Sequence, residues 1–265
     1  MKCVLFGLSG FGNEALRALR RAGVDVALVL TRREPGPFPY YEERTLAEEA
    51  RAAGLEVIED ADVRDLSLKR RVDDLAPDLV VSATFTEAVP SRFLGGGRES
   101  LGLHPSLLPA YRGATPSTWI LINRDREACG VTLHRLTGKA FTGDIVAKRA
   151  VPLEASDTDG TLRHRLAIAG GALIEDAARS LLQGETLPGV PQDEARITFY
   201  PKRTRRDSLI KFDEPTKNIL DRIRATSPWP GAWTYDGERE IEIREAEPAP
   251  EFAGSFEIAP GLVLS

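Results

Sequence analysis

Short apolar stretches alternate with longer amphipathic ones over most of the chain. Apolar runs of strand length occupy residues 2–6, 24–30, 55–58 and 78–83. Between them, apolar residues recur at helical spacing, as Phe11, Ala15 and Leu19 do, and further helices are expected at about 41–53 and 66–75. Strands that alternate with helices of this length predict an α/β fold with a mostly parallel, twisted sheet.

The pattern changes near Gly184. Before it we expect a helix through 119–122, strands at 131–136 and 145–151, and a long helix over about 160–182. After it come prolines, a basic run, a helix at 215–225 and short strands at 240–244 and 261–265. The chain is therefore predicted to hold one large α/β domain, residues 1–198, and a linker, helix and small β-rich lobe, residues 199–265.

The composition argues against nucleic-acid, metal-binding and membrane-spanning classes of protein. The 265 residues carry a formal net charge of −5, which argues against a surface that neutralises nucleic acid. The two cysteines, Cys3 and Cys129, supply neither a disulfide framework nor a metal site. No apolar run reaches membrane-spanning length and no signal-peptide pattern opens the chain, so we expect a cytoplasmic protein without a metal.

Candidate chemistry centres on one histidine at the end of an apolar run. His104 is followed by Pro105-Ser106-Leu107-Leu108-Pro109 and then by Ala110-Tyr111-Arg112-Gly113. Ligands bind at the carboxyl ends of strands in parallel α/β sheets, so His104 is expected to face a cleft. A histidine before a proline is also typical of loop packing, and the motif alone does not decide between the two.

Basic residues offer two interpretations. Arg203 and Arg205 lie in the run 202–206, which is either a solvated linker or a phosphate clamp, because guanidinium groups match phosphate oxygens. Arg112 follows the His104 loop and is the third candidate for a phosphate or carboxylate. His134 alternates with Leu133 in a strand pattern, and we interpret it as a partly buried structural histidine.

Three segments together resemble the folate-dependent formyltransferase family. They are the run 103–113, the run Gly130-Val131-Thr132-Leu133-His134-Arg135, and Thr142-Gly143-Asp144-Ile145. The family includes methionyl-tRNA formyltransferases and enzymes that formylate nucleotide-linked amino sugars. The later runs Arg203-Thr204, Ile223-Arg224-Ala225 and Pro228-Trp229-Pro230-Gly231-Ala232 look most like the amino-sugar branch, in particular the UDP-4-amino-arabinose type.

The resemblance implies a Rossmann-like formyltransferase domain followed by a shortened open-barrel lobe. It also implies 10-formyltetrahydrofolate as donor, a small primary amine as acceptor, and a homodimer. The residues expected at the folate site are Phe85, Thr86, Ser106, Leu107, Leu108 and Pro109. Thr86 and Glu87 depart from the small, apolar residues that the family favours there.

The catalytic positions of the family are only partly kept. Formyl transfer needs donors for an oxyanion and an acceptor for the proton of the amine, which the family supplies with Asn-X-His and an Asp before Thr/Ala-Gly. His104 matches, but Gly102 stands at the Asn position and Phe141 at the Asp position. Loss of one oxyanion donor lowers rates by roughly 10²–10³-fold. Asp144 is a weak substitute, because its odd spacing from Phe141 turns it to the other face of an extended segment.

Three hypotheses of different class follow. The first, an enzyme, is a one-carbon transferase that uses His104 on a small, phosphate-bearing amine. The second is a family member with changed chemistry, such as hydrolysis or transfer of another group. The third is a catalytically silent ligand sensor or partner subunit, with Phe141 as a stacking surface in a repurposed pocket.

Overall fold

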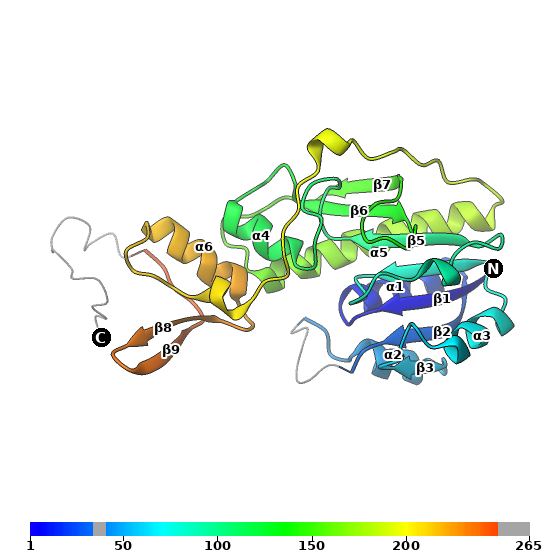
Figure 1. Cartoon of the computed structure of the whole chain (residues 1–265), viewed down its shortest axis with the longest axis horizontal. Coiled ribbons are helices and arrows are strands. Elements are labelled where there is room, and N and C mark those ends of the chain that lie inside the picture. The colour runs from blue at the N-terminus through cyan, green and yellow to red at the C-terminus, as the bar shows by residue number, and fades with distance from the viewer. Residues whose placement is uncertain (34–40, 249–265) are drawn as a thin grey trace.

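A seven-stranded sheet forms the centre of the computed structural model, which describes residues 1–33 and 41–248. The strands lie in the order β3-β2-β1-β4-β5-β6-β7 (Figure 1). Their bounds are β1 Lys2–Gly7, β2 Asp25–Thr31, β3 Val57–Glu59, β4 Leu79–Ala83, β5 Glu99–His104, β6 Gly130–Arg135 and β7 Ile145–Ala150. The first five are parallel, and β6 runs antiparallel to both β5 and β7. The predicted mostly parallel α/β sheet is confirmed.

Helices cover both faces of this sheet, because the central strands are apolar on both faces. The six helices of the described ranges are α1 Phe11–Arg21, α2 Leu46–Ala52, α3 Leu66–Asp74, α4 Pro116–Asn123, α5 Asp159–Leu182 and α6 Thr216–Thr226. Leu5 and Leu103 face a core shared with α1 and α5, whereas Phe6 and Val80 face a second core shared with α3. The site described below lies on the α3 side.

Some expected boundaries shift. The helix expected at 41–53 starts at Leu46, because the hydroxyl of Thr45 accepts a hydrogen bond from the Glu48 amide (3.2 Å) and the Glu48 carboxylate accepts one from the Thr45 amide (2.8 Å). The strand expected at 55–58 is β3, Val57–Glu59. The proline-rich loop at 34–39 and the strand expected at 261–265 lie outside the described residues.

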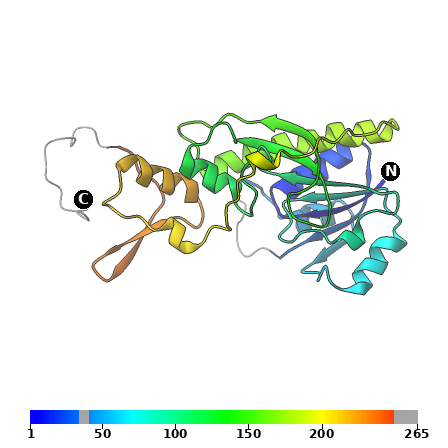
Figure 2. The same ribbon diagram turned by 45° about the horizontal axis from the view of Figure 1, so that its top comes forward.

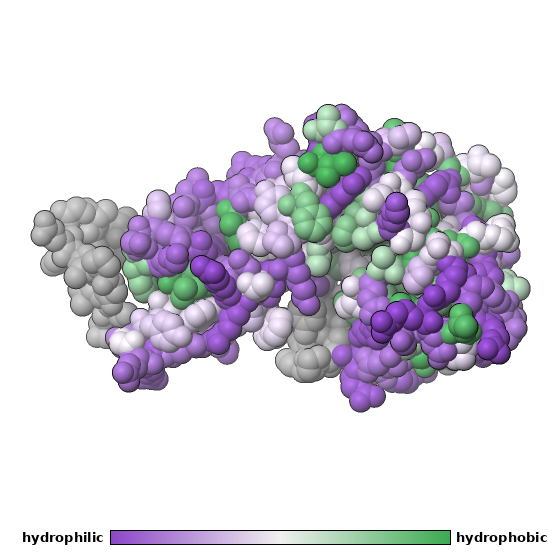
Figure 3. All heavy atoms as spheres, viewed as in Figure 1, coloured by the Kyte–Doolittle hydropathy of each residue, from purple (hydrophilic) through white to green (hydrophobic). Residues whose placement is uncertain are grey.

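The segment after α5 crosses the edge of the sheet and leads to a separate lobe. It pairs with β7 where Val190 and Ile145 exchange backbone hydrogen bonds of 2.8 and 2.9 Å, and Phe199 then bridges to Arg112. The lobe holds α6 and the hairpin of β8 Ala232–Asp236 and β9 Arg239–Ile243. It extends from one end of the sheet domain in both ribbon views (Figures 1 and 2). Hydrophilic side chains dominate the face drawn in Figure 3.

Candidate active site

Four candidate positions meet where β5 and β6 pair. Gly102 lies opposite His134, and His104 lies opposite Thr132. Residues directly opposite each other in an antiparallel pair share a face of the sheet, so all four side-chain positions point the same way. The Thr132 hydroxyl donates to the Ser106 carbonyl (2.7 Å) and accepts from the Leu108 amide (3.0 Å), which fixes the loop that follows His104.

The His104 imidazole is neutral and covered. His104 is 2% exposed, and its Nε2 lies 2.9 Å from the Tyr111 carbonyl oxygen. A carbonyl oxygen only accepts, so Nε2 carries the proton and Nδ1 is the nitrogen that can take one up. Burial lowers the pKa of His104 to about 3, because the charged form would lose its hydration.

Phe141 forms the cover. Its ring centroid is 4.6 Å from that of His104, at an interplanar angle of 50°. His104, which is expected to face a cleft, is therefore covered by the Phe141 ring in this structure. The loop 137–143 folds back over the sheet to reach it, since β6 ends at Arg135, opposite Leu101. Phe141 adopts a φ of 63°, a region that non-glycine residues rarely occupy.

Gln192 holds this loop in place, and nothing in the sequence pattern marked it. Its side-chain nitrogen donates to the carbonyl oxygens of Phe141 (2.9 Å) and Gly143 (2.7 Å). Its side-chain oxygen accepts from Arg112 at 2.6 and 3.2 Å. Gln192 thus joins the loop after β5 to the loop after β6, although it lies in an irregular connection where a lone glutamine carries no signal.

The glycine at position 102 is explained by its neighbours. A Cβ atom built there would lie 2.9 Å from Cε1 and Nε2 of His134 and 2.8 Å from Cδ2 of Leu136. Such distances leave no room for a side chain unless the His134 imidazole and the Leu136 side chain move. The space beside position 102 is therefore occupied by His134 and Leu136.

The residues expected to bind folate divide into two groups. Ser106 and Leu108 are fully buried, and the Ser106 hydroxyl donates to the Ala110 carbonyl (2.7 Å), so both support the loop from inside. Leu107 and Pro109 are partly exposed on its outer side. Backbone geometry, rather than polarity, separates the two groups.

The loop after β4 is fastened to β2 by an ion pair. Arg32 contacts Glu87 at 2.5 Å and lies 5.5 Å from the centroid of the Phe85 ring. The Thr86 hydroxyl accepts a longer bond of 3.4 Å from Arg32, and the Phe85 ring packs edge-on to Phe6 at 5.6 Å. The departure from the family at Thr86 and Glu87 is thus matched by a partner for both side chains.

The predicted phosphate-binding arginines do not form one cluster. Arg205 pairs with Glu240 and covers the Trp233 ring at 4.5 Å, so it belongs to the lobe. Arg203 donates to the Ser208 hydroxyl at 3.1 Å, and burial lowers its pKa although the charge of Asp159 acts in the opposite direction. Arg112 is the arginine near the site, because its charge lowers the pKa values of both His104 and His134.

Asp144 is not brought to His104. Its carboxylate oxygen lies 3.2 Å from where a Cβ atom of Gly189 would stand, at the outer edge of the sheet. Its carbonyl accepts from the Arg135 amide (2.9 Å), whereas His104 pairs with Thr132, three residues back along β6. The register therefore separates the two residues, as their odd spacing suggested.

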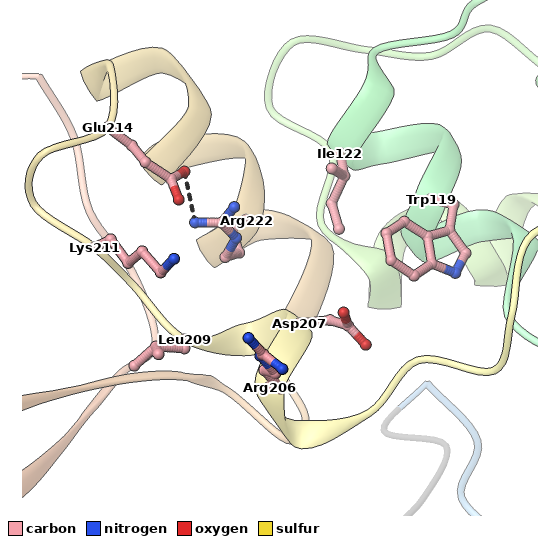
Figure 4. Close-up of a pocket in the computed structure, with 8 residues that line it drawn as sticks. All are labelled: Trp119, Ile122, Arg206, Asp207, Leu209, Lys211, Glu214 and Arg222. Atoms are coloured by element: carbon pink, nitrogen blue, oxygen red, sulfur yellow. Dashed lines mark hydrogen bonds and ion pairs between the residues drawn. The ribbon is translucent and has the colours of Figure 1, made fainter.

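A pocket of about 270 Å³ lies between α4 and the lobe. It is lined by Trp119, Ile122, Arg206, Asp207, Leu209, Lys211, Glu214 and Arg222 (Figure 4). Glu214 and Arg222 form an ion pair across one side at 2.8 Å. None of the residues around His104 lines it.

Within residues 1–33 and 41–248, no set of three or more His, Cys, Asp or Glu side chains is placed to hold a metal ion. No helix in those ranges combines the length and the apolarity that a membrane crossing requires.

Comparison with known proteins gives matches to family models and to solved structures. Residues 1–177 match the model described as formyl transferase, and residues 202–265 match the formyl transferase C-terminal domain. A sugar N-formyltransferase from Shewanella superposes with a TM-score of 0.71 at 17% identity, over 94% of this chain and 99% of that one. An N-formyltransferase from Helicobacter canadensis, in complex with folinic acid and dTDP-3-aminofucose, gives a TM-score of 0.65 at 19% identity, over 85% and 80% of the two chains.

A longer protein shares the fold as well. HypX from Aquifex aeolicus, in complex with tetrahydrofolic acid, superposes with a TM-score of 0.66 at 18% identity. The match covers 99% of this chain and 40% of that one, so this chain corresponds to less than half of HypX. At such identities these likenesses concern the fold.

Proposed function

Because the chain belongs to the formyl transferase family, a family of transferase enzymes, we propose that it moves a formyl group from 10-formyltetrahydrofolate to an amine. The acceptor is a small molecule that bears phosphate, such as a nucleotide-linked amino sugar. Tetrahydrofolic acid, folinic acid and an amino sugar nucleotide in the neighbouring structures support this choice of ligands. The chain is a soluble, cytoplasmic protein in this proposal, and a homodimer stays a prediction.

The observation that carries the proposal is the neutral imidazole of His104 at the end of β5. Negative charge develops on the formyl oxygen as the amine attacks the formyl carbon. That charge raises the pKa of a nearby imidazole, so His104 takes up a proton from solvent at Nδ1 as the neutral amine attacks, and donates it in a hydrogen bond to the oxygen. The proton returns to solvent when the intermediate collapses and the oxygen becomes a carbonyl again. Arg112 lies close enough to hold an anionic group of the acceptor once Gln192 releases it.

Access requires the loop 137–143 to move. Phe141 covers His104 in this structure, so donor and acceptor reach the imidazole when this loop lifts from it. The folate then lies along the loops 84–90 and 106–109, against Phe85, Leu107 and Pro109. Thr86 borders the same space.

The test is formyl transfer from 10-formyltetrahydrofolate to a panel of nucleotide-linked amino sugars, followed by mass spectrometry of the product. We expect a formylated product from the unaltered chain and a loss of at least about 10²-fold in His104→Ala. His164→Ala is the matched control, because it removes an exposed imidazole on α5. No product across the panel would overturn the proposal.

Phe141 favours a second candidate function. A phenyl ring at the position of the family carboxylate neither accepts a proton nor orients an imidazole, which suits a binding protein or a changed reaction. Tight binding of 5-formyltetrahydrofolate in calorimetry, together with no transfer to any amine, would support the silent protein. Release of formate from the donor without an acceptor would support hydrolysis.

A further inference from the structure

His134 is the second buried histidine of this face, and the first proposal leaves it without a task. It lies directly across from Gly102 and diagonally across from His104, a position from which side chains on one face reach each other. It is 4% exposed. Its charge and that of His104 act on each other, since His134 contributes to the lowered pKa of His104.

The hydrogen bond of His134 defines which nitrogen is free. Nδ1 lies 2.9 Å from the Arg135 carbonyl oxygen, which only accepts, so the proton is on Nδ1. Nε2 then carries a lone pair and faces the space above Gly102, where a Cβ atom would stand only 2.9 Å away. The hydrogen bond at Nδ1 is the only one that the His134 ring forms with residues 1–33 and 41–248, so Nε2 has no partner among them.

We propose that His134 accepts the proton that the acceptor amine loses during formyl transfer, an inference that rests on the proposed function. The amine nitrogen bonds to the formyl carbon, and the carbonyl electron pair moves to oxygen. The nitrogen, now positively charged, gives a proton to Nε2 of His134. The bond from carbon to N10 of the folate then breaks, and N10 takes that proton back from the imidazolium, which leaves the formamide, tetrahydrofolate and a neutral His134.

The surroundings allow this brief positive charge. The Arg135 carbonyl supports the Nδ1 proton of an imidazolium, and the oxyanion of the intermediate supplies a negative charge on the same face. Burial and, to a smaller extent, the charge of Arg112 lower the pKa of His134, so the imidazolium is stable only while the oxyanion exists. A base that is neutral before attack and returns to neutrality after collapse meets both requirements.

Gly102 is the other half of this arrangement. A side chain at position 102 would push the His134 ring aside, because its Cβ atom alone reaches both Cε1 and Nε2. The absence of a side chain at position 102 and the position of the His134 ring are therefore coupled. The site has no amide at position 102 of β5, and the His134 imidazole of β6 lies over that position.

The test compares His134→Gln and His134→Ala with the unaltered chain in formyl transfer. We expect kcat to fall by about 10²–10⁴-fold with little change in the KM of the amine, and imidazole in the buffer to restore part of the rate of His134→Ala. His164→Gln is the control for an imidazole elsewhere. If His134→Gln keeps kcat within about threefold while the unaltered chain transfers formyl, this inference is overturned and the proposed function stands.

Gly102→Ala, made in the unaltered chain and in His134→Ala, distinguishes a loss of the proton acceptor from a general loss of folding. Gly102→Ala should lower kcat in the unaltered chain by displacing the ring, and should lower kcat much less in the His134→Ala background, where Leu136 is the remaining close neighbour of the new Cβ atom. Nitrogen NMR should find the proton of His134 on Nδ1. A proton on Nε2 contradicts the inference whatever the activity, and a chain with no transfer at all overturns both proposals.

Discussion

At the level of single residues, Phe141 is part of the cover that keeps His104 away from water. Burial holds the pKa of His104 near 3, and the phenyl ring, 4.6 Å away, offers no negative charge that would raise it. The family position is a carboxylate by resemblance, which would act in the opposite direction. The residue at position 141 is therefore expected to affect the protonation state of His104.

Phe141→Asp should raise the pKa of His104 by more than one unit, because a carboxylate a few ångströms away stabilises the imidazolium. Aspartate also tolerates the backbone conformation at this position, where φ is 63°, better than phenylalanine does. NMR titration of the His104 ring gives the pKa directly. Phe141→Leu is the control, and an equal rise in that variant would contradict the electrostatic explanation.

The same histidine links stability to pH. Its pKa is about 3 in the folded chain and near its ordinary 6.5 when unfolded, so between these values the unfolded chain binds more protons. Stability is thus present above pH 6.5 and is lost as the pH falls towards 3, with a slope that approaches about 1.4 kcal/mol per pH unit. His104→Gln should reduce that slope in urea unfolding measured from pH 7 to 4, and an unchanged slope would show that other groups cause the loss.

At the level of elements, the connection after α5 holds the two loops of the site together. Gln192 holds the loops after β5 and β6 together through Arg112 and the carbonyls of Phe141 and Gly143. The 190–192 stretch is itself fixed to β7 through Val190. The position of Phe141 over His104 therefore depends on a segment that lies some fifty residues away in sequence.

Gln192→Ala should make the loop 137–143 more mobile, because it removes the hydrogen bonds to the carbonyls of Phe141 and Gly143. We expect faster hydrogen exchange at the amides of residues 137–143, and a loss of about 1–3 kcal/mol in the free energy of unfolding, because buried hydrogen bonds lose their partner. Gln183→Ala, an exposed glutamine at the end of α5, serves as control. Unchanged exchange in 137–143 would mean that the loop is held by other contacts.

The sheet and its main helices could be predicted from the sequence because they depend on local periodicity. Strands β1, β2, β4 and β5 show as apolar runs, and His104 was found at the end of one of them. The antiparallel direction of β6 could not be predicted, since it depends on long-range pairing. For the same reason the contact between Gly102 and His134, the cover provided by Phe141 and the role of Gln192 appeared only in the structure.

At the level of the whole molecule, the lobe is attached to the sheet domain mainly through α4 and α6. Arg124, at the end of α4, forms an ion pair with Asp221 of α6, which is 4% exposed and also contacts Arg224. Trp119 and Ile122 of α4 line the pocket that lies along the same junction (Figure 4). Because the buried Asp221 carboxylate is paired with both Arg124 and Arg224, the loss of either arginine should weaken this contact.

Arg124→Ala should therefore weaken the junction by about 1–3 kcal/mol, because it leaves the Asp221 carboxylate less well compensated. We expect limited proteolysis to cut faster between residues 184 and 215 in this variant. Arg126→Ala, an exposed neighbour, is the control. Equal rates of cleavage in the two variants would contradict a role of the ion pair in holding the lobe.

The phenyl ring that lies 4.6 Å from His104 has a consequence for side reactions. An activated formyl group beside an imidazole is open to attack by water as well as by an amine, and exclusion of water suppresses the first route. A site that stays covered until its acceptor is present would lose little donor as free formate. The ratio of formamide to formate would then be high, and it would fall as the ring at position 141 is made smaller.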